Sequence, residues 1–259
     1  MKGFVKRWFD GPEQDAEPID AALEPGRRVY CIGDVHGRCD LLREVHGMIA
    51  EDAGGFEGHR SVVYLGDLID RGMGSRDVVD LLLDEPLEGF EAVYLRGNHE
   101  QTLLDFLEYP EQAESWLLWG GRETVLSYGV ALPPGMQRAD PQAIRDALAS
   151  RIPERHVAFY RAMAVYHEAG DYLFVHAGIR PGVPLQEQSD SDLMWIRGEF
   201  LESEEDHGRV VVHGHSITEL VEMRANRIGI DTGAYRSGVL TCLVLEGGER
   251  RLMQTGGAP

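Results

Sequence analysis

One pattern recurs five times along the chain and limits the folds that it can adopt. A short apolar run, rich in β-branched or aromatic residues, ends abruptly in a polar cluster that contains glycine. The five runs with their clusters span residues 29–37, 61–72, 91–100, 172–178 and 210–215. Short apolar runs bounded by glycine are typical of buried strands, and α/β folds place ligand sites at the carboxyl ends of such strands. The pattern therefore predicts an α/β protein with one site built from five distant segments.

The segments around these runs complete the predicted fold. Apolar residues recur at helical spacing in 41–49 and 78–83, so the chain starts with alternating strands and helices, which favours a mostly parallel first sheet. Residues 227–253 follow the order strand, turn, strand, with Gly247 and Gly248 in a hairpin. We expect a second sheet to pack on the first, giving an α/β fold of two packed mixed β-sheets flanked by helices.

The length of 259 residues suits a single domain that follows a leader. We predict a loosely ordered leader over 1–26 and one domain over 27–259. Residues 101–169 are predicted to be helical, with breaks at prolines, and to form a cap-like region beside the site. An alternative for the leader is that its basic and aromatic stretch, 4–9, touches a membrane surface or a partner. It has neither the apolar core of a signal peptide nor the length of a membrane span.

Charge and cysteine content narrow the partners and the compartment. Asp and Glu number 44 against 25 Lys and Arg, which gives a formal net charge of −19. Such a charge repels nucleic acid and anionic membranes, so we expect no nucleic-acid partner and no stable membrane insertion. Three scattered cysteines are too few for a disulfide framework, which fits a reducing, cytoplasmic compartment. The sequence leaves the oligomeric state open.

Eight polar side chains stand at the predicted strand ends and combine three kinds of metal ligand. They are Asp34, His36, Asp67, Asp70, Asn98, His99, His176 and His215. Carboxylate, imidazole and amide oxygen together suit manganese, iron or zinc rather than calcium. Any one of these residues alone would more often be a solvated loop residue, a cap or a turn former. Because five strand ends supply the set together, we predict a metal centre.

The clusters also form a known series. GDVHG, GDLIDRG, GNHE, HAG and GH occur in this order, and the segments 116–121, 195–197 and 230–234 accompany them. With these motifs the chain resembles the PPP serine/threonine phosphatases within the calcineurin-like metallophosphoesterases, and in particular their compact bacterial and phage-lambda-type branch. The resemblance covers about residues 28–246, and it is more specific for the family than for the substrate.

The resemblance implies two divalent metal ions held by six ligands. Manganese is expected, with iron or zinc as alternatives. One ion would bind to Asp34 and His36, the other to Asn98, His176 and His215, and both to the bridging Asp67. Two ions about 3.5–4 Å apart clamp the attacking and leaving oxygens of a displacement and lower the pKa of a bound water toward about 7. The implied reaction is hydrolysis of a phosphate ester by a metal-bound hydroxide.

The same resemblance assigns the acid and the phosphate-binding groups. His99 would act as general acid, oriented by Asp70, because a histidine held near the ions by a carboxylate can protonate a leaving alkoxide. Arg71 and Arg197 would grip the phosphate oxygens, with help from the amide of Asn98. A planar guanidinium matches phosphate oxygens well. Two ions and two arginines make the pocket locally positive, so a strongly acidic protein can still bind an anion.

The predicted function is a phosphoprotein phosphatase that hydrolyses phosphoserine and phosphothreonine esters. The alternative in the same family is a symmetrical dinucleoside-tetraphosphate hydrolase, which cleaves a phosphoanhydride with the same ions. A nuclease-like phosphodiesterase fits less well, because readers of nucleic acid carry a basic face. A non-catalytic scaffold would be expected to lose ligands or the acid, and this sequence keeps all of them. The expected partner is a phosphorylated protein or a small phosphoester.

Overall fold

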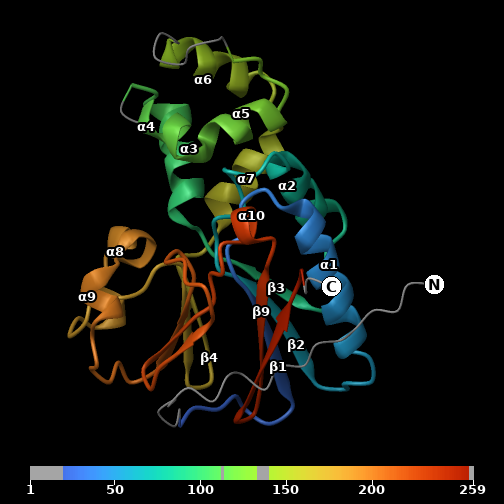
Figure 1. Ribbon diagram of the computed structural model, residues 1–259, viewed down its shortest axis with the longest axis vertical. Coiled ribbons are helices and arrows are strands. Elements are labelled where there is room, and N and C mark those ends of the chain that lie inside the picture. Colours follow the sequence, from blue (N-terminus) through green and yellow to red (C-terminus); the bar gives the residue numbers. More distant parts are fainter. Residues whose placement is uncertain (1–19, 112–113, 133–139, 257–259) are drawn as a thin grey trace.

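The computed structural model describes residues 20–111, 114–132 and 140–256, which form two five-stranded sheets (Figure 1). The first sheet contains β1 (Arg27–Ile32), β2 (His59–Tyr64), β3 (Glu91–Tyr94), β9 (Thr241–Glu246) and β10 (Glu249–Gln254), in the order β10-β9-β1-β2-β3. The strands β1, β2 and β3 pair in parallel, whereas β9 and β10 are antiparallel. The predicted parallel start and the hairpin at Gly247 and Gly248 are both confirmed.

The second sheet also combines three parallel strands with two antiparallel ones, and most of its strands are shorter. It contains β4 (Tyr166–Ala169), β5 (Tyr172–Val175), β6 (Val210–His213), β7 (Glu222–Met223) and β8 (Arg227–Gly229), in the order β4-β5-β6-β8-β7. Parallel pairing joins β5, β6 and β8, and antiparallel strands lie at both edges. Each sheet therefore has three parallel strands whose carboxyl ends can supply polar side chains.

Alternation along the buried strands builds a layered core. In β1, Val29 and Cys31 face the second sheet, where they join Phe174 of β5 in one apolar cluster. Tyr30 and Ile32 point the other way, into a larger cluster beneath the helices of the first sheet. Successive side chains of a strand point to opposite faces, so one continuous apolar run can serve two layers. The predicted fold of two packed mixed sheets flanked by helices is confirmed.

Helices cover the outer faces of both sheets (Figure 1). The first sheet carries α1 (Cys39–Asp52) and α2 (Ser75–Asp84), and the second carries α8 (Asp190–Trp195) and α9 (Gly198–Leu201). Two short helices, η3 (Leu185–Glu187) and α10 (Ala234–Ser237), lie in loops. On α1 the buried residues recur at helical spacing, so its apolar side faces the core.

The predicted helical region forms a separate group above the sheets (Figure 1). Its helices are α3 (Asn98–Glu108), α4 (Glu114–Trp116), η1 (Leu117–Gly121), α5 (Arg122–Ser127), α6 (Pro141–Ala149) and α7 (Glu154–Ala162). The region starts and ends earlier than the predicted 101–169. Helix α3 begins within the GNHE cluster, and Tyr166–Ala169 forms β4 because it pairs with β5 through a tight turn at Gly170.

The last residues of the predicted leader belong to the fold. Ala21 and Leu23 are buried between the sheets, and the N–H of Leu23 donates to the carbonyl of Gly247 at 2.9 Å. Residues 1–19 of the predicted leader lie outside the described part of the chain. Among the helices that the structure describes, none has the length and apolar character needed to cross a bilayer.

Candidate metal centre

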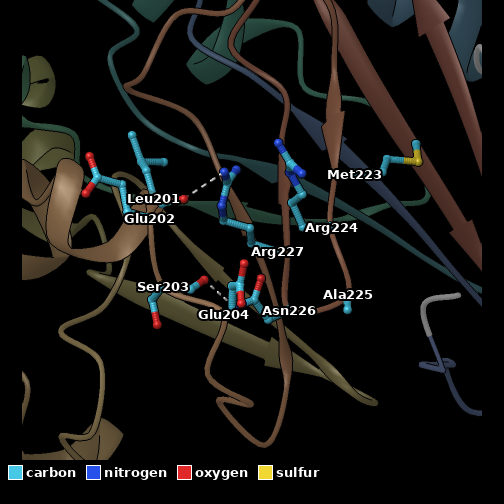
Figure 2. A pocket seen from close by; sticks show the side chains of 9 residues that line it. All are labelled: Leu201, Glu202, Ser203, Glu204, Met223, Arg224, Ala225, Asn226 and Arg227. Atoms are coloured by element: carbon cyan, nitrogen blue, oxygen red, sulfur yellow. Dashed lines mark hydrogen bonds between the residues drawn. The ribbon is translucent and has the colours of Figure 1, made fainter. Parts of the chain in front are cut away.

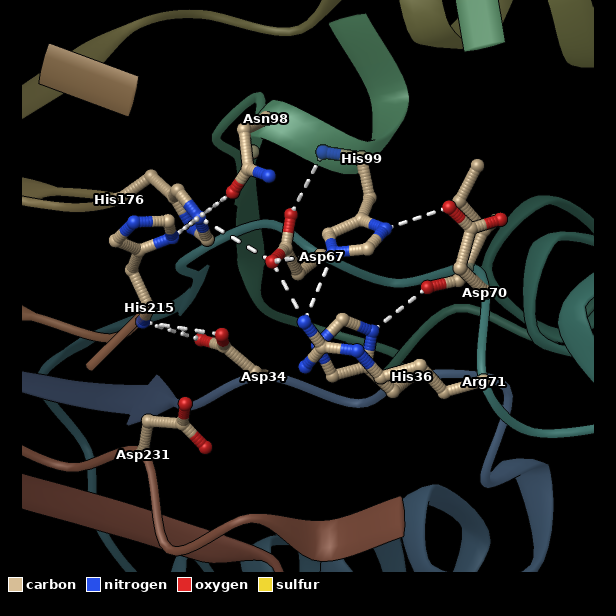
Figure 3. Close-up of polar contacts among 12 residues, drawn as sticks. Asp34, His36, Asp67, Asp70, Arg71, Asn98, His99, His176, His215 and Asp231 are labelled. Carbon is tan, nitrogen blue, oxygen red and sulfur yellow. Dashed lines mark hydrogen bonds and ion pairs between the residues drawn. The ribbon is translucent and has the colours of Figure 1, made fainter. Parts of the chain in front are cut away.

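The polar ends of five parallel strands meet at one place (Figure 3). Asp34 follows β1, Asp67 follows β2, Asn98 follows β3, His176 follows β5 and His215 follows β6. All five residues are buried, with at most 6% of their surface exposed. Segments that lie far apart in the sequence thus form one polar site at the carboxyl edge of both sheets.

The backbone of this site is strained. Among the described residues other than glycine, positive φ occurs at His36 (45°), Asp67 (48°), Asp70 (74°), Arg71 (65°) and His215 (61°). All five are predicted site residues. A side chain held in this region costs roughly 1–3 kcal/mol, and such residues cluster at functional sites. The fold therefore gives up stability here to aim these side chains inward.

Asp67 lies at the centre of the site. Its Oδ2 atom is 3.4 Å from Nε2 of His176, 3.6 Å from Nε2 of His36 and 3.8 Å from Nε2 of His99. The potential ligand atoms form two groups, one with His36, Asp67 and His99, the other with Asp67, His176 and His215. Within each group these atoms lie within 4.8 Å of one another. Asp67 alone belongs to both, which is the position that a bridging ligand needs.

The second group takes its side chains from three strand ends. His176 Nε2 lies 3.0 Å from Oδ1 of Asn98 and 3.2 Å from Nδ1 of His215. The other nitrogen of His176, Nδ1, donates to the carbonyl of Leu65 at 2.9 Å, which orients the ring. Metal-binding histidines are commonly oriented by such a bond from the second ring nitrogen. His176 thus contacts both of the other residues predicted to share its ion.

The first group differs in one member from the predicted ligands of the first ion, which are Asp34, His36 and the bridging Asp67. His36 lies in it, with Nδ1 donating to the carbonyl of Ile69 at 2.8 Å. His99 occupies the third place, whereas Asp34 falls outside both groups. The carboxylate of Asp34 accepts the backbone N–H of His215 at 3.0 and 3.2 Å, and so lies beside the site on the side of the second sheet.

His99 and Asp70 form a buried pair. Nδ1 of His99 donates to Oδ2 of Asp70 at 2.6 Å, which turns Nε2 toward Asp67. Burial lowers the pKa of His99, but the charge of Asp67 and the hydrogen bond to Asp70 outweigh it, so the pKa lies above its ordinary value. The raised pKa favours the protonated imidazolium, which is the form that can donate a proton.

Two residues that hold Asp70 were not given a role by the sequence. The indole Nε1 of Trp116 donates to Oδ2 of Asp70 at 2.6 Å, and the hydroxyl of Thr124 donates to Oδ1 at 2.5 Å. Gly121 lies against Trp116 so closely that an added Cβ would stand 2.3 Å from the indole ring. The signal was present in the segment 116–121, where a tryptophan precedes two glycines, but its partner lies 46 residues away.

Glu100 holds together loops of the site, a role that its sequence does not predict. It stands in the first turn of α3, where an acidic side chain is favourable. It is fully buried and accepts the backbone N–H groups of Gly97, Asp67 and Leu68 at 2.7–2.9 Å. Burial, with the charge of Asp67, raises the pKa of Glu100 to about 7. Glu100 thus ties together the loops after β2 and β3.

The two predicted phosphate-binding arginines lie at the rim of the site. Arg71 Nη1 is 2.6 Å from Nε2 of His36, and its Nη2 is 3.1 Å from Nε2 of His99. The guanidinium lies over the ring of Tyr235, 4.9 Å from its centroid. Arg197 is more exposed, with Nη1 3.4 Å from the carbonyl of His215. Each arginine thus contacts a residue of the predicted ligand set, Arg71 the ring of His36 and Arg197 the backbone of His215.

Residues 27–236 match the sequence pattern described as calcineurin-like phosphoesterase. The chain belongs to this family. It is therefore a metallophosphoesterase, in agreement with the predicted enzyme class.

Among its relatives are asymmetrical bis(5'-nucleosyl)-tetraphosphatases named PrpE. The protein of Bacillus thuringiensis (strain Al Hakam) is 23% identical over 232 residues, which cover 82% of this phosphoesterase and 88% of the relative. A protein of the same name from Bacillus cereus (strain AH820) is 22% identical over the same shares of both chains.

Solved structures share the fold. A putative diadenosine tetraphosphatase superimposes with a TM-score of 0.62 at 19% identity, over 92% of this phosphoesterase and all of that chain. A serine/threonine phosphatase of Saccharomyces cerevisiae, with similarity to a human phosphatase, gives a TM-score of 0.52 at 14% identity. This match covers 91% of the phosphoesterase and 82% of the yeast chain.

The buried donors of the phosphoesterase fit divalent ions. Burial lowers the pKa of His36, and it lowers that of His215 to about 2, so both imidazoles are neutral and can offer a lone pair. Nε2 of His215 is buried and has no hydrogen-bond partner among the described residues. Burial would raise the pKa of Asp67, but the charges of His176 and His99 hold it well below its ordinary value. This set of neutral imidazoles and an ionised carboxylate fits the dimetal centre that the family implies.

Two exposed tryptophans stand next to the metal centre. Trp119 and Trp195 are 51% and 39% exposed, and their ring centroids lie 6.2 Å apart. Trp195 also contacts the ring of His215, with the centroids 6.3 Å apart. Large exposed aromatic side chains beside a catalytic site suggest contact with a substrate.

A cavity of about 570 Å³ lies away from the metal centre (Figure 2). It is lined by residues 201–204, from the end of α9 onward, and 223–227, from the end of β7 to the start of β8. Arg227 donates to Glu222 at 2.8 Å and to the carbonyl of Leu201 at 3.0 Å, and Asn226 donates to the carbonyl of Ser203 at 2.9 Å. These polar groups hold the turn in place, and the cavity contains none of the predicted site residues.

Proposed function

We propose that this phosphoesterase hydrolyses phosphoserine and phosphothreonine esters in proteins, as a member of the PPP branch. The main support is the position of Asp67, which is shared by two groups of ligands and faced by the His99–Asp70 pair. We place the enzyme in the cytoplasm, since its three cysteines are free.

Six residues would hold the two ions, manganese in the first instance with iron or zinc as alternatives. They are Asp34, His36, Asp67, Asn98, His176 and His215. When bound, the ions polarise the phosphate and lower the pKa of the attacking water. Asp67 and Asp34 would offer carboxylate oxygens to the two cations, and the imidazoles of His36, His176 and His215 would complete the ligand set with the amide oxygen of Asn98.

His99 would protonate the leaving oxygen. Asp70 accepts from Nδ1, so the remaining nitrogen, Nε2, faces the site and can carry the proton that is transferred. Trp116 and Thr124 fix Asp70, and so they also fix the direction in which His99 points. General acid catalysis of this kind contributes about 10²–10⁴-fold to the rate.

Arg71 and Arg197 would bind the phosphate oxygens, with the amide of Asn98. Arg71 reaches the rings of His36 and His99, while Arg197, which lies between α8 and α9, reaches the backbone carbonyl of His215. The two guanidinium groups therefore flank the site from opposite sheets. This arrangement suits a tetrahedral phosphate, whose oxygens point in several directions.

A second substrate class is a dinucleoside tetraphosphate. Two observations favour it: the names of the curated relatives and the exposed pair Trp119–Trp195 beside His215. A nucleobase can stack on an aromatic ring while the adjoining polyphosphate lies against the arginines. The relatives are named for asymmetrical cleavage, whereas the motifs alone had suggested symmetrical cleavage.

The deciding experiment compares a phosphopeptide and diadenosine tetraphosphate side by side with added manganese. We expect the higher kcat/KM for the phosphopeptide. A clear preference for the dinucleotide would replace the proposed substrate while leaving the metal centre in place. Failure to hydrolyse either substrate, with manganese bound, would contradict both.

A further inference from the structure

A sixth parallel strand also ends at the metal centre, and its polar residue has no assigned role. The strand is β8, which pairs in parallel with β6. Its chain continues through Ile230 to Asp231, at the same edge where β6 delivers His215. Three parallel strands of the first sheet and two of the second supply proposed ligands, so Asp231 completes the set of strand ends.

Asp231 is buried and only partly satisfied. It is 1% exposed, and its Oδ1 accepts the backbone N–H of Gly233 at 2.9 Å. The N–H of Thr218 donates to the backbone carbonyl of Asp231 at 3.0 Å, which fixes the loop. Its other oxygen, Oδ2, has no hydrogen-bond partner among the described residues. A buried carboxylate oxygen without a partner is costly, so its presence calls for a positive group nearby.

Among the described residues, no cationic side chain forms an ion pair with Asp231. Figure 3 shows the carboxylate of Asp231 pointing toward Asp34, a second buried carboxylate. Elsewhere in the chain, the carboxylate of Asp52, whose side chain is 6% exposed, does have cationic partners. Three groups contact this carboxylate: Arg251 donates to it at 3.0 Å, the hydroxyl of Tyr30 donates to it at 2.8 Å, and Arg28 lies 3.3 Å away. Two buried carboxylates that face one another repel, and a cation between or beside them removes that repulsion.

We propose that Asp231 is an additional carboxylate of the metal centre, which binds the hydration shell of the ion held by Asp34 and His36. This inference rests on the proposed metal centre. Asp231 lies outside both groups of ligand atoms, so a contact through water fits its place better than direct coordination. The ion is a divalent transition metal, and Asp231 raises the affinity of the centre for it.

The test measures metal binding rather than activity. Asp231→Asn keeps the shape of the side chain and the acceptor for Gly233, but removes the charge. In a calorimetric titration of chelator-treated protein with Mn²⁺, we expect one of the two ions to bind about 10–100-fold more weakly, as for other residues that support a metal indirectly. The affinity for the second ion should change little.

Thermal unfolding separates this role from a structural one. Without metal, Asp231→Asn should unfold at the same temperature as the wild type or higher, because the substitution removes a buried, unpaired charge. The rise in Tm on adding Mn²⁺ should be smaller than in the wild type. A residue that only stabilises its loop would lower Tm equally with and without the ion.

Two matched variants complete the experiment. Asp52→Asn removes a buried carboxylate that has its own cations, so it should lower Tm and leave Mn²⁺ binding unchanged. Asp34→Asn removes a proposed ligand and should weaken the same ion as Asp231→Asn. If the wild type binds no Mn²⁺, the metal centre itself is wrong. If it binds two ions and Asp231→Asn binds them with the same affinities, only this inference is overturned.

Discussion

Two histidines of the metal centre, one beside each sheet, are buried to a similar degree but held in opposite ways. His99, after β3, is 3% exposed, and His215, after β6, is 6% exposed. The pKa of His99 is raised, because the charge of Asp67 and the bond to Asp70 outweigh burial. The pKa of His215 is lowered to about 2, chiefly by burial. The ring of His99 is hydrogen-bonded to the carboxylate of Asp70, whereas no carboxylate among the described residues is hydrogen-bonded to the ring of His215. This difference favours the protonated form of His99 and the neutral form of His215.

The difference divides the site into two functions. The side with His99, Asp70 and Arg71 is rich in charge, and we propose that it donates the proton. The side with His176 and His215 consists of imidazoles that contact one another and a backbone carbonyl. Asp67 lies between the two sides and contacts both. Substitutions on either side should therefore have effects of different kinds, which can be measured separately.

The largest effect is expected where the two sides meet. Asp67→Asn replaces the carboxylate that both ligand groups share, so we expect loss of both ions and of all measurable turnover. The loss of metal affinity should exceed the roughly 10–100-fold cost of an indirect partner. Metal content after dialysis measures it. His215→Asn is the control and should lose one ion. Retention of two ions by Asp67→Asn would contradict the bridging role.

The next effect belongs to the proton-carrying side alone. His99→Asn should lower kcat by about 10²–10⁴-fold with little change in KM, since proton donation develops in the transition state. Metal content should stay at the wild-type value. Steady-state kinetics on a phosphopeptide, with metal analysis of the same preparation, gives both quantities. An unchanged kcat would remove the general acid from the mechanism.

A smaller and more specific effect is expected from Asp70→Asn. The general acid must be protonated, so kcat falls as the pH rises through the pKa of His99. Asp70 raises that pKa, and its neutral replacement lowers it. The alkaline limb of the pH–rate profile should therefore move toward lower pH. Activity near the acidic end should be less affected than activity at neutral pH. A profile that keeps its alkaline limb would mean that another group titrates there.

The parts of the molecule that the sequence predicts are those with a local pattern. Each strand end is visible because an apolar run stops at a glycine-containing cluster within a few residues. The glycines have a local reason too. At Gly97, an added Cβ would stand 2.1 Å from the carboxylate of Asp67. Such close contacts explain why glycine is needed in these clusters, and the glycine-containing clusters in turn mark the strand ends in the sequence.

What the sequence does not reveal depends on partners distant in the chain. The segment 116–121 is distinctive, but it does not indicate that the indole of Trp116 will hold Asp70, 46 residues away. Tyr166–Ala169 was predicted to be helical, but it forms a strand because it pairs with β5. The residues around Asp231 do not show whether it only forms a turn or also faces a metal ion. Its role becomes visible only when Asp34 is placed opposite.

The smallest expected effect concerns substrate binding on the side of the site that contains His176 and His215. Trp195 contacts His215 and Trp119 and is partly exposed, so it can stack on a substrate without touching the proton-carrying pair. Stacking of a base on an aromatic ring contributes about 1–3 kcal/mol. Trp195→Ala should then raise KM for diadenosine tetraphosphate by about 5–100-fold, with kcat nearly unchanged and a smaller change for a phosphopeptide. Trp195→Phe should recover most of the loss, because the ring is kept. Equal changes in KM for the two substrates would show that the tryptophan only supports the loop of His215, and the case for a nucleotide substrate would lose its structural basis.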